Sequence, residues 1–466
     1  MILLVRLARR VSMAPSSPKG KRRAGDAPRS PQASKRTVQS STTQSAVASF
    51  FTPVSQKPKD RVVWSQRALD AGATPTLLVG RYDTDDAELM RRCKMAVFDL
   101  DSTLIVPSSG KKHASGASDW KWWHPSVPTK LRQLHHEQGY RIVILSNQAG
   151  LSLQPPASSS KAPKAGILRR TADFKHKCAS VLANLDLPTT VYAATERDAF
   201  RKPRTAMWTQ ACRDYDVAES DVDMQGSFFV GDAGGRIASP DRGFAKDFSC
   251  SDRNFAHNVG IDFKTPEEFF LGLPPRDFRR ELDLVRYPFA ESDGEQQPPV
   301  FRRTNKRDVV LFCGPPGAGK STFYRNYLEP LGYERVNQDT LKSRDKCVRT
   351  ARDLLREGSS VAVDNTNADP ETRAIWVQLA KTAGVPIRCV WFKTPLAVCE
   401  HNDAVRALNP SLNPEARTGL PKLAFTGFSS RFKEPKVSEG FEDVGEVEFE
   451  FRGSRSEYEV WGRYWT

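Results

Sequence analysis

Residues 95–104 read Met95-Ala96-Val97-Phe98-Asp99-Leu100-Asp101-Ser102-Thr103-Leu104. The apolar run 95–98 predicts a buried strand, and Asp99 and Asp101 follow its end. In an open α/β sheet, ligands bind at the carboxyl ends of the strands. Two carboxylates this close repel each other unless a cation lies between them, and Mg²⁺ prefers oxygen ligands. One carboxylate can then attack phosphorus while the other moves protons. The alternative is a solvated turn, which a lone pair of aspartates would also fit.

Polar residues also mark the ends of strands predicted further along the chain. Residues 141–148, RIVILSNQ, predict a buried strand that ends at Ser146, whose hydroxyl can bind a phosphate oxygen. Lys202 stands directly before a proline in a later loop, where a lysine can be held rigidly and aimed at a phosphate. Another apolar run ends at Asp232, which is therefore the predicted third acid for the metal ion.

The order of these features resembles the haloacid dehalogenase (HAD) phosphatase superfamily. The resemblance implies that Asp99 is the nucleophile, and that Asp101 protonates the leaving hydroxyl and then activates water. It also implies that Ser146 and Lys202 hold the transferring phosphoryl group. The implied Mg²⁺ ligands are Asp99, the carbonyl group of Asp101, and Asp232. Further substrate contacts are predicted for Thr103, Asn147 and Arg236.

A second motif follows an apolar run in the last third of the chain. Residues 308–313 predict a strand that leads into GPPGAGKST and then into a helix at 323–328. This pattern, in this context, is the P-loop: backbone N–H groups wrap phosphates, Lys320 reaches the β- and γ-phosphates, and Ser321 binds Mg²⁺. No G-protein base-recognition signature follows, which favours a kinase. The predicted nucleotide-binding residues are Gly314, Gly317, Gly319, Lys320, Ser321 and Thr322.

Three polar residues after the P-loop are candidates for the phosphoryl transfer. Asp339 follows a predicted strand end and could take the proton of an attacking hydroxyl. Arg406 lies in a predicted helix, where it could close over the phosphates as a lid arginine, because guanidinium grips phosphate oxygens in a fork. The alternative for Arg406 is a surface charge. Arg373, also in a predicted helix, is a candidate substrate contact.

A HAD phosphatase followed by a P-loop kinase resembles the polynucleotide kinase 3′-phosphatases of DNA strand-break repair. The likeness runs from about residue 62 onward. Matching segments include FDLDSTL, DWKWW, FRKP, FFVGDAGGR, DFSCSDRNFA, TPEEFF, GPPGAGKST, VNQDT and DNTN. The family implies that one activity removes a 3′-phosphate from a DNA end, while the other moves the γ-phosphate of ATP to a 5′-hydroxyl.

Two departures from the family and two alternatives accompany this resemblance. Family members often have glycine where this chain has Ser102, and a small residue should still fit. About 60 residues precede the catalytic part, too few for the FHA domain of animal members, so recruitment should differ. An RNA end-healing enzyme would use the same two chemistries. A non-catalytic scaffold is the alternative of another class, although both predicted sites keep their catalytic residue types.

The composition supports this organisation. The chain has 466 residues, of which 39% are hydrophobic, enough for two or three domains. We predict a basic disordered tail at 1–60, a HAD-like Rossmannoid α/β phosphatase domain at 61–275, a linker at 276–306 and a P-loop α/β kinase domain at 307–466. Within the first domain, helices are predicted at 127–138 and 171–185, and residues 152–165 are predicted to form a surface insertion.

The cysteines and the hydropathy of the chain indicate its redox environment and its relation to membranes. The eight cysteines are scattered without a CxxC pair, which argues against a zinc site or a disulfide framework and favours a reducing compartment. No apolar run approaches the length of a membrane span. We therefore expect no membrane partner, and we expect a monomer that acts on DNA strand-break ends.

The tail holds most of the positive charge. Of the net charge of +15, residues 1–60 supply +10, from twelve Lys and Arg against two acids. Residues 1–12 are apolar and Arg-bearing and resemble a mitochondrial presequence; the alternative is an extension before a second start at Met13. Lys21-Arg22-Arg23 with Lys35-Arg36 resembles a bipartite nuclear localisation signal, and a solvated tail is the alternative. We predict a nuclear protein, with mitochondria as a second location.

One peptide in the tail differs from its surroundings. Residues 44–51, QSAVASFF, resemble the PIP box, the peptide that binds the sliding clamp PCNA. A helical turn would place Val47, Phe50 and Phe51 on one side as anchors for an apolar pocket, while Gln44 would fill a polar one. The alternative is that the phenylalanines dock on the protein itself. We expect this peptide to recruit the enzyme through the clamp.

Overall fold

The computed structural model describes residues 61–82, 91–154, 164–289 and 301–466. The predicted presequence, localisation signal and PIP-box-like residues Gln44, Val47, Phe50 and Phe51 lie outside these described residues. None of the helices in the described ranges is long and apolar enough to cross a membrane. All eight cysteines lie in the described residues and are free thiols.

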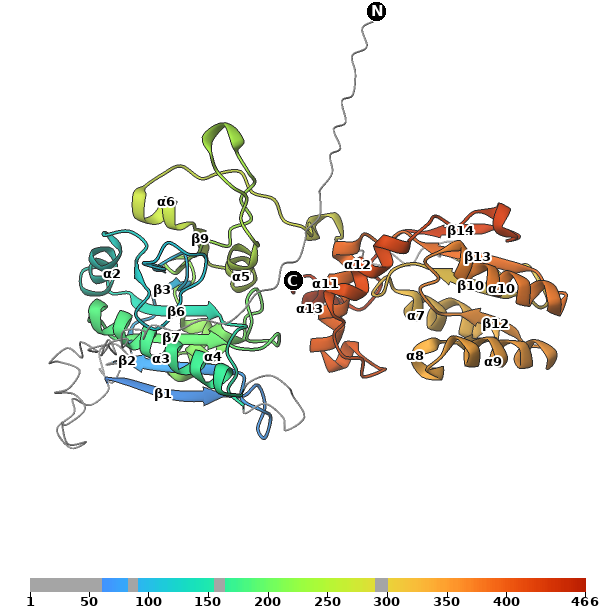
Figure 1. Cartoon of the computed structure of the whole chain (residues 1–466), viewed down its shortest axis with the longest axis horizontal. Coiled ribbons are helices and arrows are strands. Elements are labelled where there is room, and N and C mark those ends of the chain that lie inside the picture. The colour runs from blue at the N-terminus through green and yellow to red at the C-terminus, as the bar shows by residue number, and fades with distance from the viewer. Residues whose placement is uncertain (1–60, 83–90, 155–163, 290–300) are drawn as a thin grey trace, which may run out of the picture. The chain divides into compact units, whose positions relative to one another are not determined.

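The first half of the described chain forms a seven-stranded sheet in the order β1-β2-β7-β6-β3-β8-β9 (Figure 1). The strands from β7 to β9 pair in parallel, whereas β1 and β2 are added in antiparallel fashion at one edge. The strands are β1 (Val62–Arg67), β2 (Leu77–Tyr82), β3 (Met95–Phe98), β6 (Arg141–Asn147), β7 (Thr189–Ala194), β8 (Phe228–Val230) and β9 (Asp262–Lys264). A short antiparallel pair, β4 (Ile105–Val106) and β5 (Lys121–Trp122), follows β3.

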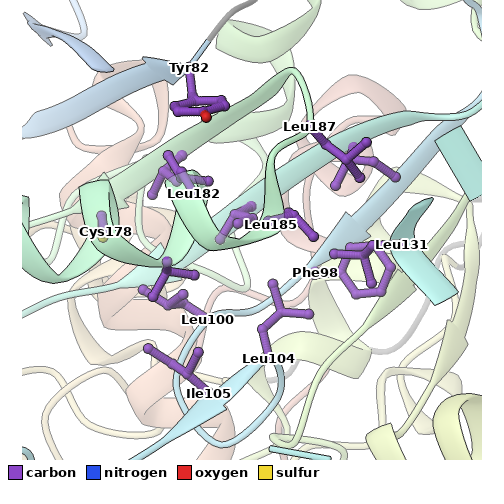
Figure 2. Packing of buried hydrophobic residues seen from close by; sticks show 14 of the residues in the cluster. Tyr82, Phe98, Leu100, Leu104, Ile105, Leu131, Cys178, Leu182, Leu185 and Leu187 are labelled. Atoms are coloured by element: carbon purple, nitrogen blue, oxygen red, sulfur yellow. The ribbon is translucent and has the colours of Figure 1, made fainter. Parts of the chain in front are cut away.

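Helices cover both faces of this sheet, which explains why its central strands are buried over nearly their whole length. The helices are α2 (Val127–His136), α3 (Lys164–Leu185), α4 (Ala206–Asp214), α5 (Ser251–Val259) and α6 (Pro266–Leu271). On one face, Phe98 and Leu100 pack with Leu182 and Leu185 of α3 (Figure 2). On the other face, side chains of α4 and α5 pack against Val97 and its neighbours.

The second half of the described chain forms a separate parallel sheet in the order β11-β12-β10-β13-β14. Its strands are β10 (Val309–Cys313), β11 (Tyr333–Val336), β12 (Ser360–Val363), β13 (Ile387–Phe392) and β14 (Val444–Val447). Its helices are α7 (Lys320–Phe323), α8 (Gln338–Leu341), α9 (Arg344–Arg356), α10 (Pro370–Ala383), α11 (Leu396–Leu408), α12 (Lys422–Arg431) and α13 (Arg455–Trp461). Two sheets, each with helices that alternate with its strands along the chain, confirm the predicted α/β fold class.

Several boundaries differ from the predicted ones. Helix α3 begins at Lys164, earlier than the predicted 171, so the predicted insertion 152–165 overlaps its first turn. The helix expected at 323–328 begins instead at Lys320 and continues as a π-helical turn, Tyr324–Leu328. In both cases the helix starts before its apolar periodicity becomes clear in the sequence.

The stretch predicted as a linker is packed over part of its length. Leu282 and Leu284 are buried in a cluster that also contains Val398, Val405 and Trp461. The short 3-10 turn Leu284–Arg286 begins at Asp283, whose side chain accepts a hydrogen bond from the backbone N–H of Val285. These apolar contacts fix residues 282–284 on the second sheet's helices.

Candidate active sites

The first candidate site lies at the carboxyl end of β3. Asp99 follows this strand and is buried. The Lys202 ammonium lies 2.7 Å from Asp99 Oδ1 and 2.9 Å from Asp252 Oδ1, and it donates to the carbonyl oxygen of Leu145 at 2.7 Å. The structure therefore brings Lys202, which was predicted to hold the phosphoryl group, beside the predicted nucleophile Asp99, and all three donor positions of the lysine are filled.

Three carboxylates converge at this site. Asp99, Asp232 and Asp252 each offer an oxygen, and these oxygens lie within 4.8 Å of one another. Asp232 follows β8 as predicted, whereas Asp252 comes from the first turn of α5 and was not predicted. A compact set of carboxylate oxygens is the donor chemistry that Mg²⁺ prefers, so these residues fit that ion.

The electrostatics of the cluster favour a cation. Burial raises the pKa of Asp99 to about 7, with Lys202 opposing the rise and Asp252 adding to it. Burial and the charge of Asp99 likewise raise the pKa of Asp232 to about 8. Burial lowers the pKa of Lys202, but the carboxylates of Asp252 and Asp99 outweigh it, so the net shift is upward. One lysine cannot neutralise three acids, and a bound cation would relieve the remainder.

Asp101 lies apart from this cluster and is half exposed. Its two carboxylate oxygens accept hydrogen bonds from Lys177 Nζ at 2.9 Å and from Gln148 Nε2 at 2.6 Å. Neither partner was predicted, because Lys177 lies in the middle of α3 and carries no local motif. Ser102, directly after Asp101, has a left-handed backbone with φ of 64°. Asp101 is thus a fixed but solvent-accessible carboxylate beside a buried one.

Two residues predicted to contact substrate instead hydrogen-bond within the protein. Thr103 is fully buried, and its hydroxyl accepts a hydrogen bond from the backbone N–H of Asp232 at 3.1 Å. The Asn147 amide brackets the backbone of Lys202: its Oδ1 accepts from the N–H at 2.9 Å and its Nδ2 donates to the carbonyl at 3.1 Å. Their polar atoms are occupied within the protein, so they position Asp232 and Lys202. Ser146 remains at the site, buried, with its Oγ accepting from Gln148.

The two arginines predicted to bind substrate are also engaged internally. Arg236 is buried and pairs with Asp247 at 2.9 Å and with Glu267 at 2.6 Å. Arg373 is fully buried and forms a two-pronged contact with Glu439 at 2.7 and 2.8 Å. A buried guanidinium whose three nitrogens all contact carboxylates or backbone carbonyls has no fork left for a phosphate. These contacts correct the predicted substrate roles of both residues.

The second candidate site is the cavity of 1740 Å³ beside the P-loop. Lys320 at the start of α7 is buried, and its ammonium donates to the carbonyl oxygens of Gly314 at 3.0 Å and Pro315 at 2.5 Å. Gly317 has φ of 79°, and a Cβ there would lie 2.3 Å from the carbonyl oxygen of Cys399. Only glycine fits at this position of the loop. The remaining predicted P-loop residues, Gly319, Ser321 and Thr322, line the same cavity.

Two charged residues that the sequence did not single out meet the P-loop serine. Ser321 Oγ donates to Asp364 Oδ2 at 2.8 Å, and Asp364 follows the end of β12. The Arg335 guanidinium, from β11, donates to Ser321 Oγ at 2.9 Å and to Asp364 Oδ2 at 2.5 Å and 2.8 Å. A hydroxyl and a carboxylate held together at a P-loop are suitable ligands for Mg²⁺.

The remaining predicted kinase residues also line the cavity. Asn337 caps α8 by accepting a hydrogen bond from the backbone N–H of Asp339 at 2.8 Å. This cap fixes the backbone of Asp339, whose side chain is 71% exposed and pairs with Arg417 at 3.1 Å. Arg406 on α11 pairs with Asp403 at 2.5 Å and lines the cavity.

The P-loop is also supported from the last helix of the chain. Asn402 Nδ2 on α11 donates to the carbonyl oxygen of Gly317 at 2.9 Å. Trp461 Nε1 at the end of α13 donates to Asn402 Oδ1 at 2.7 Å. The Asn402 amide is thereby held by two neighbours, so its contact with the loop is fixed.

Known proteins resemble both halves of the described chain. The polynucleotide kinase 3 phosphatase family matches residues 94–270, and an AAA domain family matches residues 309–435. A bifunctional polynucleotide phosphatase/kinase of Schizosaccharomyces pombe is 36% identical over 397 residues, which are 84% of this chain and 87% of the relative. A polynucleotide 3′-phosphatase of Saccharomyces cerevisiae is 30% identical over 216 residues, which are 38% of this chain and 86% of the relative. The chain belongs to the family of bifunctional polynucleotide phosphatase/kinases.

Proposed function

We propose that this enzyme prepares broken DNA ends by removing 3′-phosphates and by phosphorylating 5′-hydroxyl groups with ATP. Family membership gives it polynucleotide phosphatase and kinase activities. The observation that carries the proposal is that one chain contains two sites whose side chains suit phosphate chemistry. Asp99 and Lys202 form the centre of the first site, and Lys320 and Ser321 form the centre of the second. An RNA end-healing enzyme, the second candidate, would use the same residues, so the experiment below compares both polymers.

The first half of the phosphatase reaction transfers the phosphoryl group to the enzyme. One Asp99 oxygen attacks the phosphorus of the 3′-phosphate, a new O–P bond forms, and the bond from phosphorus to the 3′-oxygen breaks. The protonated Asp101 carboxyl gives its proton to the departing oxygen, which leaves as a 3′-hydroxyl. The accessible position of Asp101 suits it for proton exchange, and its contacts with Lys177 and Gln148 fix its orientation.

The second half returns Asp99 to its starting state. The Asp101 carboxylate, now without its proton, takes a proton from a water molecule whose oxygen attacks the phosphorus. The bond between the Asp99 oxygen and phosphorus breaks, and inorganic phosphate leaves. Lys202 offsets negative charge on the phosphoryl oxygens in both halves. Asp99, Asp232 and Asp252 would hold Mg²⁺, which when bound would supply further charge neutralisation.

The kinase reaction uses the P-loop cavity. The loop amides and Lys320 bind the β- and γ-phosphates of ATP. Asp339 accepts the proton of the 5′-hydroxyl, whose oxygen attacks the γ-phosphorus while ADP leaves. Ser321 and Asp364 would hold the Mg²⁺ of the nucleotide. The exposure of Asp339 supports this role because a polymer end must reach it from solvent.

The deciding experiment measures phosphate release from a 3′-phosphorylated nicked DNA with Mg²⁺ and without ATP. Wild type should release phosphate and Asp99→Asn should not, because an amide cannot attack phosphorus. Asp221→Asn, a change at an exposed aspartate in the turn Glu219–Asp221, is the matched control and should behave as wild type. Release from a 3′-phosphorylated RNA but not from the DNA would overturn the DNA assignment in favour of RNA end healing.

We further propose that the tail peptide 44–51 recruits the enzyme to PCNA and that the protein works in the nucleus. The support is the match at Gln44, Val47, Phe50 and Phe51, together with the two basic clusters of the tail. A pull-down with PCNA should succeed with wild type. The double change Phe50→Ala and Phe51→Ala should abolish it, and binding that survives this change would refute the recruitment proposal.

A further inference from the structure

One carboxylate in the kinase cavity faces three guanidinium groups. Glu415 lies in the irregular segment 413–420 and lines the cavity. Its Oε1 lies 2.9 Å from Arg335 Nη1 and 3.3 Å from Arg325 Nη1, and its Oε2 accepts from Arg417 Nε at 2.7 Å. The three arginines come from β11, from the turn after α7 and from the same segment as Glu415. Three separate parts of the chain therefore direct positive charge at one point.

This point lies between the P-loop and the proposed catalytic base. Arg335 also donates to Ser321 Oγ at 2.9 Å, which places its guanidinium beside the P-loop. Arg417 also lies 3.1 Å from Asp339 Oδ2. The arginine set thus spans the gap that a phosphoryl group must cross between the nucleotide and an acceptor held by Asp339.

The chemistry of the set suits a phosphate better than a carboxylate. Glu415 offers two oxygens and one negative charge to three guanidiniums, whereas a terminal phosphate offers three oxygens and more charge. Burial raises the pKa of Glu415, but the contacts with Arg335 and Arg417 outweigh it, so the net shift is downward and the carboxylate is ionised. All four side chains are between 20% and 35% exposed, so solvent and a ligand can reach them.

We propose that Arg325, Arg335 and Arg417 bind the terminal phosphate group of the donor nucleotide, and that the Glu415 carboxylate is an internal competitor for this site. The proposal rests on the proposed kinase function and adds to it a set of phosphate-binding residues. The segment 413–420 would then exchange its ion pairs for nucleotide contacts in each catalytic cycle, because Glu415 must leave the arginines before phosphate can bind them.

The donor nucleotide is favoured over the acceptor strand for a geometric reason. Arg335 touches the serine of the P-loop, and the helix that begins with the P-loop lysine leads directly to Arg325. A P-loop fixes the β- and γ-phosphates of its nucleotide.

The test measures equilibrium binding of AMP-PNP, ADP and AMP, each with Mg²⁺, by calorimetry on the full chain. Glu415→Gln keeps the side-chain shape and removes the competing charge, so it should tighten AMP-PNP binding about tenfold and leave AMP within about twofold. Arg335→Gln should weaken AMP-PNP binding about tenfold, ADP less, and AMP hardly at all. The tighter binding expected for Glu415→Gln is the more decisive result, because a misfolded variant cannot bind more tightly.

Two further variants complete the design. Arg335→Gln also leaves buried Asp364 without its arginine partner. Arg417→Gln removes an arginine of the same set without this side effect, because its partner Asp339 is 71% exposed, and it should likewise weaken AMP-PNP binding. Arg356→Gln, on α9, removes an exposed arginine that pairs only with Asp353 among the described ion pairs, and it should bind all three nucleotides as wild type does. Phosphate release from 3′-phosphorylated DNA on each variant reports that the chain is folded.

Three results would overturn the inference. Unchanged AMP-PNP affinity in Glu415→Gln would mean that the carboxylate does not compete with phosphate. An equal loss for AMP-PNP, ADP and AMP in the arginine variants would assign the network a purely structural role. Unchanged nucleotide affinity with a raised KM for 5′-hydroxyl DNA would place the acceptor strand on the arginines. Failure of wild type to bind AMP-PNP would instead refute the proposed kinase function itself.

Discussion

The two candidate sites differ in how far their charged side chains are exposed to solvent. In the phosphatase site the side chains of Asp99, Lys202 and Asp252 are 10%, 1% and 2% exposed. In the kinase site the Asp339 side chain is 71% exposed and Arg417 is 24% exposed. The buried site keeps its charges paired inside the protein before any substrate arrives. The open site pairs its arginines with acids that a ligand must displace.

Because of this difference, we expect the loss of a charge to affect both stability and activity at the phosphatase site, but mainly activity at the kinase site. Charges that are buried together contribute to folding and to chemistry at once, because removing one leaves the others unpaired in a low-dielectric environment. Charges at the edge of a cavity are partly solvated, so a single loss is tolerated by the fold. Substitutions in the two sites should therefore differ in their effect on the free energy of unfolding.

The largest difference between the two sites is expected when the lysine of each site is replaced. Lys202→Met should abolish phosphatase activity and lower the free energy of unfolding by about 3 kcal/mol, since Asp99 and Asp252 lose their shared partner. Lys320 is buried too, but Lys320→Met leaves two neutral backbone carbonyls without their donor rather than two carboxylates, so it should abolish kinase activity at a cost of only about 1 kcal/mol. Both activities and denaturant unfolding check this. Equal losses of stability in the two variants would contradict the contrast.

Mg²⁺ should stabilise the phosphatase site in a pH-dependent way. The folded-state pKa values of Asp99 and Asp232, about 7 and about 8, lie above the ordinary value of 3.8. Between about pH 4 and pH 8 the folded protein therefore binds more protons than the unfolded chain. Without metal, the stabilisation that comes from this proton binding is complete below about pH 4 and is lost as the pH rises toward 8. Mg²⁺ should raise Tm by several degrees at pH 8 and by less than about 2 °C at pH 5.5.

The control for this metal effect is Asp232→Asn, which removes one of the two shifted carboxyls. Thermal melts of this variant should show a smaller gain from Mg²⁺ at pH 8 than wild type shows. A gain from Mg²⁺ that is the same at both pH values in wild type would refute the link between the raised pKa values and metal binding.

A moderate effect is expected at the residue that orients Asp101. Lys177→Met removes the 2.9 Å contact and should lower kcat for 3′-phosphorylated DNA about tenfold, since the proton donor loses its fixed position. The initial burst of p-nitrophenol from p-nitrophenyl phosphate should change little, because that leaving group needs no proton. Lys175→Met, on the same helix but over the Trp64 ring, is the control. A burst reduced as strongly as kcat on DNA would point to general damage.

The smallest effect is expected at Ser102. Its φ of 64° is in the left-handed region, where a non-glycine residue costs about 1 kcal/mol. Ser102→Gly relieves this cost but makes the unfolded chain more flexible, so the two terms nearly cancel and the net change should lie within about 1 kcal/mol. Thermal melts check the stability, and phosphatase activity should stay within about twofold. A large change in either would show that the serine hydroxyl has a separate role.

Site residues that stand next to a recognisable sequence pattern could be predicted. Asp99, Asp232 and the P-loop lysine each follow an apolar run that reads as a strand, and strand ends of a parallel sheet meet at one edge. The fold class followed from the same runs. The edge strand β1 was not predicted, because its exposed and partly buried residues give no continuous apolar run.

The parts that depend on distant contacts were not predictable from one sequence. Lys177 lies 76 residues from Asp101, and Arg335 lies 29 residues from Asp364. No local pattern connects such pairs. The same reason explains the misplaced substrate roles of Arg236 and Arg373: a charge in a turn or on a helix looks available, and only the fold reveals the acids that bury it.

The support of the P-loop by Asn402 and Trp461 has a consequence for the order of synthesis. Asn402 lies 85 residues beyond Gly317, and Trp461 lies another 59 residues beyond Asn402. While the ribosome is still making this stretch, the nucleotide site lacks part of its frame, whereas the catalytic residues of the phosphatase, the last of which is Asp252, have all been made. Since domains generally fold from the N-terminus during synthesis, a nascent chain gains its phosphate-removing function first and its phosphate-adding function last.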